Sequence, residues 1–422
     1  MIQRLYTYCL VLVLGSLTSF GQDHSLRVMH YNILNYQNNT GQCNTTTNNP
    51  GEKEGHLKRI FDYVKPDVLT LNEVGAKASN RLFILQNSLD PNLYATAAYT
   101  NNGTSNLTNA FFYRKDKLIL HSQDTIGHAP DGFRFTRVVD YYRMYLNDKA
   151  RLSMGDTAFI GVFVVHLKAG STSSDKFHRT KMVEGIMHYM ASKNYNEPKL
   201  IAGDFNTKTS TEEAYQLLIK SSSAYRFVDP VNQAGSWTNN EKYAAHHTQS
   251  TRTTDTRGGC AAGGGLDDRF DFILMDTTFF KINAKFQYQS ESYKALGQDG
   301  NHFNQAITDG TNTSVPVDVL KSLYEVSDHL PIVLDIDVEG YTLGVEELRP
   351  NSFWYTSTEQ LVFQLNTPQQ QCTLLDFSGR IVASGESANG KWVVPIDKLS
   401  SGLYFMRSSS AGQLKLQKVR IK

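Results

Sequence analysis

Apolar and polar positions follow two different periodicities over residues 26–340. Apolar runs of strand length, such as Leu26–Leu34 and Phe159–His166, are separated by stretches with helical spacing, of which His56–Val64 and Arg179–Lys193 are the clearest. The same reading predicts further strands at Val68–Leu71, Ala110–Tyr113, Leu200–Ala202, Phe270–Met275 and Ile332–Ile336. Strands that alternate with helices favour an α/β fold. Two packed sheets with outer helices and a single doubly wound sheet both fit this pattern.

Long polar stretches interrupt the pattern, and structureless segments of this length in a compact domain are usually functional or mobile. They are Gln37–Gly51, Thr100–Asn109, Ala245–Gly265 and Gly297–Ser314. Cys43 and Cys260 lie in the first and third of these loops, whereas Cys372 lies far along the chain. A disulfide between Cys43 and Cys260 and two unpaired thiols are the open alternatives.

The pattern changes after residue 340, where short alternating strands are separated by Ser-Gly, Asn-Gly and Ala-Gly pairs. The predicted strands are Leu361–Leu365, Cys372–Asp376, Arg380–Ala383, Trp392–Ile396, Leu403–Arg407 and Leu414–Arg420. This segment predicts a small all-β sandwich-like domain over residues 341–422. It holds no set of acid, base and metal-binding residues, so we expect a non-catalytic role.

Residues 1–21 have the pattern of a signal peptide. Arg4 precedes the apolar run Leu10–Leu14, and Ser19 and Gly21 are the small residues before a cleavage site at Gln22. A membrane anchor is the alternative, but the apolar run is much shorter than the roughly 18 residues that a span needs. We therefore expect a catalytic domain over residues 22–340.

Composition excludes wholesale disorder, because 40% of the 422 residues are hydrophobic and 11% are aromatic. The chain has 42 Lys and Arg residues against 41 Asp and Glu residues, and loss of Arg4 with the leader makes the mature chain formally neutral. Any affinity for nucleic acid must therefore come from a local patch or from a bound metal.

Six short segments place polar side chains at the ends of apolar strands, where they can line one shared cleft. They are Met29–Asn32, Leu69–Glu73, Val164–Lys168, Gly203–Thr207, Arg269–Asp271 and Ser327–Pro331. Together, in this order, they resemble the endonuclease/exonuclease/phosphatase superfamily of metal-dependent phosphodiesterases and phosphatases, over about residues 26–338. The resemblance implies a four-layered α/β sandwich with the site at one edge of the paired sheets.

Phosphodiester hydrolysis needs an aligned water, a base for its proton and neutralisation of the growing negative charge. Hard oxygen ligands suit Mg²⁺ or Mn²⁺, and Ca²⁺ is a further candidate. Glu73 is the best candidate ligand, with Asn32 beside it and Asp328 as a further carboxylate.

His329 is the best candidate base, since an imidazole titrates close to working pH. The resemblance implies that Asp271 is its partner. Asp204 would align the attacking water or bind a second metal, and Asn206 would hold a phosphoryl oxygen. His166 would donate a hydrogen bond to the phosphate.

The segment Asn101–Thr108 departs from the pancreatic-type deoxyribonucleases, because it lacks the Tyr and Glu that those enzymes place there. The Glu normally orients the histidine that matches His166, so that partner is missing or comes from elsewhere. Arg134 and Arg137 are alternatives for the arginine that contacts phosphate, and Lys168 is a further candidate. Nearby aromatic residues would add stacking surfaces for bases. They are Phe133, Phe135, Tyr141, Tyr142 and Phe177.

These features predict a secreted nuclease that uses a divalent metal to cut DNA, with RNA as a further substrate. The alternative is a phospholipid phosphodiesterase or a phosphomonoesterase of the same superfamily. The polar composition of the loops favours nucleic acid, because a lipid enzyme would present an apolar hairpin near the cleft.

Four segments near the C-terminus resemble the type IX secretion sorting domain of Bacteroidetes. They are Leu348–Asn351, Leu375–Val382, Leu399–Phe405 and Lys418–Lys422. The resemblance implies periplasmic entry, interaction with the type IX secretion machinery, and release or attachment at the outer-membrane surface. An ordinary accessory domain is the alternative, and we expect a monomer.

Overall fold

The structure is a computed structural model that describes residues 25–100, 105–193, 195–220, 222–255, 257–282, 284–339, 346–347, 353–356, 360–365, 369–410 and 413–421. The chain divides into two compact units, one that ends at Glu339 and one that begins at Gly340. The expected signal peptide, residues 1–21, lies outside the described residues. Each unit is described by itself below.

The first unit contains a mixed sheet with the strand order β11-β13-β1-β2-β4-β3, and β12 pairs with β13. The bounds are β1 (Ser25–Tyr36), β2 (Val68–Gly75), β3 (Tyr94–Thr96), β4 (Leu107–Arg114), β11 (Phe286–Tyr288), β12 (Lys294–Ala295) and β13 (Ile332–Val338). Three helices pack on its outer face through one apolar cluster. They are α1 (Pro50–Val64), α2 (Ala78–Asn87) and α6 (Val317–Val326).

The second sheet has the order β5-β6-β7-β8-β10-β9. Its strands are β5 (Leu118–His128), β6 (Arg134–Leu146), β7 (Phe159–His166), β8 (Lys199–Asp204), β9 (Phe227–Val228) and β10 (Asp271–Asp276). Helices α4 (Ser173–Lys193) and α5 (Glu213–Ile219) cover its outer face. The remaining elements are α3 (Lys149–Ser153) and the 3₁₀ turns η1 (Glu241–His246) and η2 (Thr277–Phe280).

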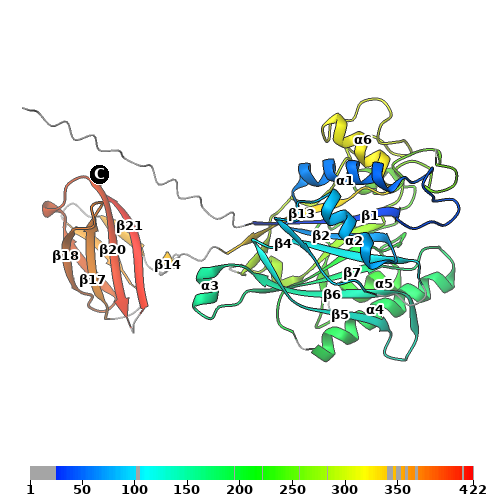
Figure 1. Cartoon of the computed structure of the whole chain (residues 1–422). Coiled ribbons are helices and arrows are strands. Elements are labelled where there is room, and N and C mark those ends of the chain that lie inside the picture. The colour runs from blue at the N-terminus through cyan, green and yellow to red at the C-terminus, as the bar shows by residue number, and fades with distance from the viewer. Residues whose placement is uncertain are drawn as a thin grey trace, which may run out of the picture. The chain divides into compact units, whose positions relative to one another are not determined.

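The inner faces of the two sheets pack against each other, as strand β7 shows. Val162 and Val164 point into the cluster shared with the first sheet, whereas Phe163 and Val165 point toward α4 and α5. Helices therefore cover both outer faces of a sheet pair (Figure 1). The predicted four-layered sandwich is confirmed, and the doubly wound alternative is wrong.

Both predicted helices begin earlier than their apolar periodicity indicates. Helix α1 starts at Pro50, because the Asn49 side chain accepts hydrogen bonds from the amides of Gly51 and Glu52 and caps the helix. Helix α4 likewise starts at Ser173 instead of Arg179. The first turns of both helices are polar, so hydrophobic spacing alone did not reveal them.

The second unit consists of two small sheets with the orders β14-β21-β20-β17-β18 and β15-β16-β19. Its elements are β14 (Glu346–Glu347), β15 (Phe353–Thr356), β16 (Gln360–Gln364), β17 (Gln371–Asp376), β18 (Ile381–Glu386), β19 (Lys391–Pro395), η3 (Ile396–Lys398), β20 (Gly402–Ser410) and β21 (Gln413–Ile421). Phe363, Leu374, Trp392 and Met406 belong to its buried core. Among the described residues, no helix is long and apolar enough to cross a membrane.

Candidate active site

Strand ends of both sheets bring polar side chains to one edge of the sandwich. In the second sheet, His166, Asp204 and Asp271 lie side by side, because His166 pairs with Asp204 and Asp204 pairs with Asp271 across β7, β8 and β10. In the first sheet, Asn32 on β1 lies next to the end of β2, which carries Glu73. Five of the predicted residues therefore converge from five strands.

Asn32 links the two sheets at this edge. Its Nδ2 donates to Glu73 Oε1 at 3.0 Å and to Asp204 Oδ2 at 3.1 Å. Glu73 has a left-handed backbone with φ 63°, and its Oε2 accepts a hydrogen bond from the Asn35 amide at 2.9 Å. A non-glycine residue held in this conformation carries backbone strain of the kind that clusters at functional sites.

The carboxylates of Glu73 and Asp204 both face the same Asn32 nitrogen, so a cation could contact both. Burial raises the pKa of Asp204 to about 7, and the negative charges of Asp271 and Glu73 add to that effect while His329 opposes it. A divalent cation would relieve this crowding of negative charge. Two carboxylates and an amide oxygen are a donor set that Mg²⁺ takes together with water.

Two details qualify the fit to a cation. The Asn32 Nδ2 atom faces both carboxylates, whereas Oδ1 accepts from the Leu34 amide at 3.1 Å, so the carboxamide must turn before its oxygen can join them around a metal. Among the described residues, no group of three or more His, Cys, Asp or Glu side chains is arranged to hold a metal ion. Asp328 points its Oδ2 at the Ala262 amide (2.8 Å), and its Oδ1 lies 3.4 Å from the Ser327 hydroxyl.

His329 and Asp271 form a buried pair. The imidazole Nδ1 lies 2.7 Å from Asp271 Oδ2, which also accepts from the Thr248 hydroxyl at 2.7 Å. Burial disfavours the charged form of both groups, but the attraction between their opposite charges outweighs this cost. The pKa of His329 therefore lies well above its usual value, and the pKa of Asp271 lies well below its usual value. The Asp271 carboxylate is therefore placed to stabilise positive charge on the His329 imidazole.

The Nε2 atom of His329 faces the remaining polar groups of the cluster. It lies 3.9 Å from Asp204 Oδ2 and 2.7 Å from the side-chain nitrogen of Gln249. Gln249 was not predicted, because nothing in the polar loop around it has a recognisable spacing. Its backbone pairs with Asp268 and with His329, and this pairing places the carboxamide next to His329 Nε2.

His30 is a second residue that sequence reasoning missed. Its Nε2 lies 3.5 Å from Asp271 Oδ1 and its Nδ1 lies 2.9 Å from the Thr70 hydroxyl. Burial lowers the pKa of His30. Asp271 lies between two imidazoles, those of His329 and His30. A usable signal was the spacing, because His30 precedes Asn32 by two positions in an extended strand and both side chains point to one face.

His166 and Asn206 both lie beside Asp204. His166 Nε2 lies 3.5 Å from Asp204 Oδ2, and burial, followed by the charges of Arg137 and His329, brings the pKa of His166 well below its ordinary value. The Asn206 amide donates to Asp204 Oδ1 at 3.0 Å, and its Nδ2 donates to the Leu167 carbonyl at 3.2 Å. Asp204 is thus the carboxylate next to His166.

A model of the Endonuclease/Exonuclease/phosphatase family matches residues 29–329, which include every strand end of this cluster. The chain belongs to this family. Its members are phosphoester hydrolases that generally use divalent metals such as Mg²⁺. No curated protein matches the chain.

The fold is similar to those of several solved structures. A family protein from Bacteroides thetaiotaomicron is 15% identical, with a TM-score of 0.47 over 74% of this chain and 94% of that one. The human Nocturnin catalytic domain with bound sulfate is 16% identical, with a TM-score of 0.45 over 75% and 96% of the two chains. D. rerio TDP2 with a single-strand DNA product is 12% identical, with a TM-score of 0.47 over 75% and 100%.

The basic residues of this family member differ in where they point. Arg134 and Arg137 are three positions apart on β6 and so face opposite sides of the strand. Arg134 is exposed, whereas Arg137 donates to the Leu167 carbonyl at 3.3 Å. Burial lowers the Arg137 pKa, and the nearby charges of Glu73 and Asp204 raise it. Arg137 therefore lies beside the cluster, and Lys168 pairs instead with Asp175 at 2.9 Å.

The expected stacking surface is smaller than the sequence indicated. Phe135 and Tyr141 are buried in the core of the second sheet, because the strand alternation of β6 turns them inward. Phe177 is 48% exposed and packs edge-to-face on Phe133 with ring centroids 5.4 Å apart. Only this pair from the predicted set remains near the surface.

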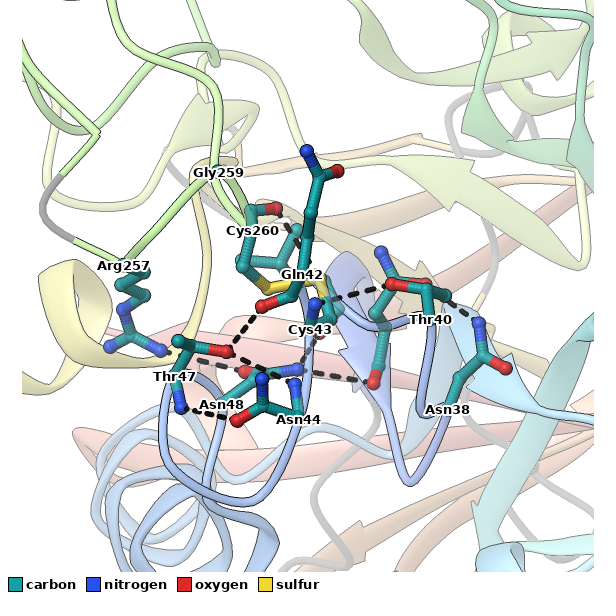
Figure 2. Close-up of a disulfide and its surroundings, with 12 residues drawn as sticks. Asn38, Thr40, Gln42, Cys43, Asn44, Thr47, Asn48, Arg257, Gly259 and Cys260 are labelled. Atoms are coloured by element: carbon teal, nitrogen blue, oxygen red, sulfur yellow. Dashed lines mark hydrogen bonds between the residues drawn. A yellow bond between two sulfur atoms is a disulfide. The ribbon is translucent and has the colours of Figure 1, made fainter.

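A disulfide joins the two long loops beside the cluster, so of the two alternatives left open by the sequence the Cys43–Cys260 bridge is the one observed (Figure 2). Next to it, the Asn48 side chain donates to the carbonyls of Leu34 and Asn35. The Asn35 amide in turn contacts Glu73, and Ala262, two residues after Cys260, contacts Asp328. The disulfide thus ties together the two segments that hold these carboxylates.

Proposed function

We propose that the protein is a secreted, divalent-metal-dependent nuclease that hydrolyses phosphodiester bonds of DNA, with RNA as a further substrate. The observation that carries the proposal is the buried His329–Asp271 pair, in which the imidazole Nε2 lies 3.9 Å from Asp204. A base, a water-aligning carboxylate and a candidate cation site thereby surround one point at the sheet edge.

Hydrolysis would proceed by in-line attack of water on phosphorus. Glu73 and Asn32, with Asp328 as a further ligand, would hold Mg²⁺ or Mn²⁺, with Ca²⁺ as a further candidate, and the ion would supply positive charge for the phosphoryl oxygens. His329 removes the proton of the water at Nε2, and Asp271 stabilises the imidazolium that results.

The remaining polar groups position water and phosphate. Asp204 accepts a hydrogen bond from the attacking water, which fixes its direction of approach. Asn206, His166 and Arg137 donate hydrogen bonds to phosphoryl oxygens. Before reaction, Gln249 must release the His329 nitrogen that it contacts at 2.7 Å.

The loops beside the cluster support nucleic acid as the substrate class. None of the exposed large apolar side chains of the described residues belongs to the loops at 37–51 and 245–265. A surface of this kind suits a strand held through its phosphates more than a lipid bilayer. Arg137 and the exposed Phe177 offer one cation and one stacking surface.

A substrate panel tests the proposal. The purified mature chain, residues 22–422, is incubated with circular and linear DNA, single-stranded DNA, RNA, sphingomyelin and an inositol phosphate, with Mg²⁺ and with chelator. We expect metal-dependent cleavage of the polynucleotides and no turnover of the other two. Turnover of sphingomyelin or of the inositol phosphate without any cleavage of nucleic acid would overturn the nuclease assignment.

We further propose export through the signal peptide at residues 1–21 and the type IX machinery, with residues 341–422 as the sorting domain and the mature protein a monomer. The Cys43–Cys260 disulfide supports an oxidising compartment. Deletion of residues 345–422 in the native host should leave active enzyme in the periplasm. Unchanged extracellular activity would refute the sorting role.

A further inference from the structure

A chain of buried side-chain hydrogen bonds leads from Asp204 away from the catalytic edge. The Asp204 amide donates to Asn72 Oδ1 at 2.9 Å. Asn72 Nδ2 donates to Asn109 Oδ1 at 2.8 Å, and Asn109 Nδ2 donates to Asp140 Oδ2 at 2.8 Å. We call these four residues the Asp140 chain. The mechanism above uses only the first of them.

The Asp140 chain crosses between the two sheets. Asp204 and Asp140 lie on β8 and β6 of the second sheet, and Asn72 and Asn109 lie on β2 and β4 of the first. All four residues are buried, with Asn72 and Asp140 fully enclosed. Polar groups in such an interior are costly unless each is hydrogen-bonded, so the chain restricts how the two sheets meet at this edge.

Asn109 also connects the chain to the backbone of β6 and β7. Its Nδ2 lies 3.4 Å from the carbonyl oxygens of both Val138 and Val164. Val138 follows Arg137 on β6, and Val164 precedes His166 by two residues on β7. The same carboxamide therefore contacts the backbone of the strands that present the phosphate-binding candidates.

The position of Asp204 is coupled to this chain, because its backbone amide donates to the Asn72 side chain at 2.9 Å. Its carboxylate accepts from the Asn206 amide and from Asn32 Nδ2, and it lies 3.5 Å from His166 Nε2. A shift of Asn72 would move the Asp204 backbone and carboxylate together. Misplacement of a reacting group by about 1 Å can cost about 10²-fold in rate.

We propose that Asn72, Asn109 and Asp140 are positioning residues that hold Asp204 in the orientation required for hydrolysis, with Asp140 as the far anchor. The proposal rests on the proposed function for its kinetic consequence. Its structural consequence, the restraint of the Asp204 amide, does not depend on that function.

The test uses isosteric variants of the mature chain. N109D keeps the acceptor for Asn72 but replaces the donor to Asp140 with a carboxylate oxygen, so two carboxylates face each other. The double variant N109D/D140N restores a donor and an acceptor in reversed order. D67N is the matched control, because Asp67 is also a buried carboxylate. It accepts from the Arg27 backbone amide and from Lys117, and it directly precedes β2 at the end away from Glu73.

For N109D we expect kcat to fall about 10²-fold with KM changed less than about threefold, since positioning and not binding is lost. Residue-resolved hydrogen exchange should show the Asp204 amide exchanging at least about tenfold faster, because its acceptor is released. The double variant should recover at least about tenfold in kcat. D67N should lower thermal stability and leave both readouts within about twofold.

An unchanged rate of hydrogen exchange at the Asp204 amide of N109D would overturn the proposal. A wild-type kcat in N109D together with a lowered melting temperature would also overturn it, because the chain would then affect stability alone. If N109D does not fold, D140N serves instead, because it keeps a side-chain oxygen that accepts from Asn109 and removes the negative charge of Asp140. Its Asp204 amide should exchange about threefold faster, and unchanged exchange counts against the proposal. A wild-type protein without phosphoesterase activity would refute the proposed function, and exchange alone would then decide on the chain.

Discussion

Replacement of Asp271 by asparagine is the sharpest single perturbation of the proposed chemistry. Asp271 is fully buried, and its Oδ2 is 2.7 Å from both His329 Nδ1 and the Thr248 hydroxyl. Its Oδ1 is 3.5 Å from His30. D271N preserves the shape of the side chain and removes the negative charge that holds the pKa of His329 well above its ordinary value.

The size of the effect follows from the burial of the pair. Removal of one partner of a buried, hydrogen-bonded charge pair costs about 3–5 kcal/mol. If most of that loss is felt when the imidazolium forms in the transition state, the rate falls by about 10²- to 10⁴-fold, at 1.36 kcal/mol for each factor of ten. The loss should appear in kcat, because Asp271 has no contact with the substrate.

The assay is single-turnover cleavage of a labelled oligonucleotide with saturating Mg²⁺. T248V is the matched control, because it removes a neutral hydrogen bond to the same carboxylate oxygen and should cost less than about tenfold. Circular dichroism confirms that each variant is folded. A D271N rate within tenfold of the wild-type rate would refute the assignment of His329 and Asp271 as the base and its partner.

Three further predictions follow from the structure. R137A should lower kcat/KM about 10- to 10²-fold while R134A stays within about threefold, as measured by steady-state cleavage, because only Arg137 lies beside the carboxylates; equal losses would contradict this difference. The C43S/C260S variant should lose about 2–5 kcal/mol of unfolding free energy, measured in urea. It should also bind Mg²⁺ more weakly, measured by calorimetry. Unchanged metal affinity would show that the disulfide does not restrain Glu73 and Asp328. Burial opposes the charge on Asp229, but its buried partner Arg269 holds the Asp229 pKa below the ordinary value. The stability that this ion pair contributes is therefore present above about pH 4 and is lost as the pH falls through the lowered pKa. The melting temperature of D229N should depend less on pH in this range than that of the wild type.

The fold could be predicted from sequence wherever periodicity was strong. The strand at Phe159–His166 was predicted with its observed bounds, because its residues are almost all buried apolar ones. Helix α1 was predicted from His56 but begins at Pro50, since its first turn is defined by a side-chain cap. The choice between a sheet pair and a single sheet depends on long-range pairing, which no local pattern contains.

The candidate site was likewise predicted only in part. Residues at strand ends, such as Glu73, Asp204 and Asp271, were named because their segments resemble motifs of the family, and the pairing of the strands brings them together. His30 and Gln249 were not, because the first lies within a strand and the second in a loop without periodicity. The neighbour of His166 was also unforeseen: Asp204 adjoins it through strand register, and register is invisible in a single sequence.

The claim that one cluster at this edge cleaves phosphodiesters is tested most directly by supercoiled plasmid and the variant H329A of the mature chain. Relaxed or linear plasmid is quantified on gels over time with Mg²⁺ and with chelator. The account predicts that wild type cuts only with metal and that H329A is at least about 10²-fold slower. Metal-dependent cutting by H329A at the wild-type rate would contradict it.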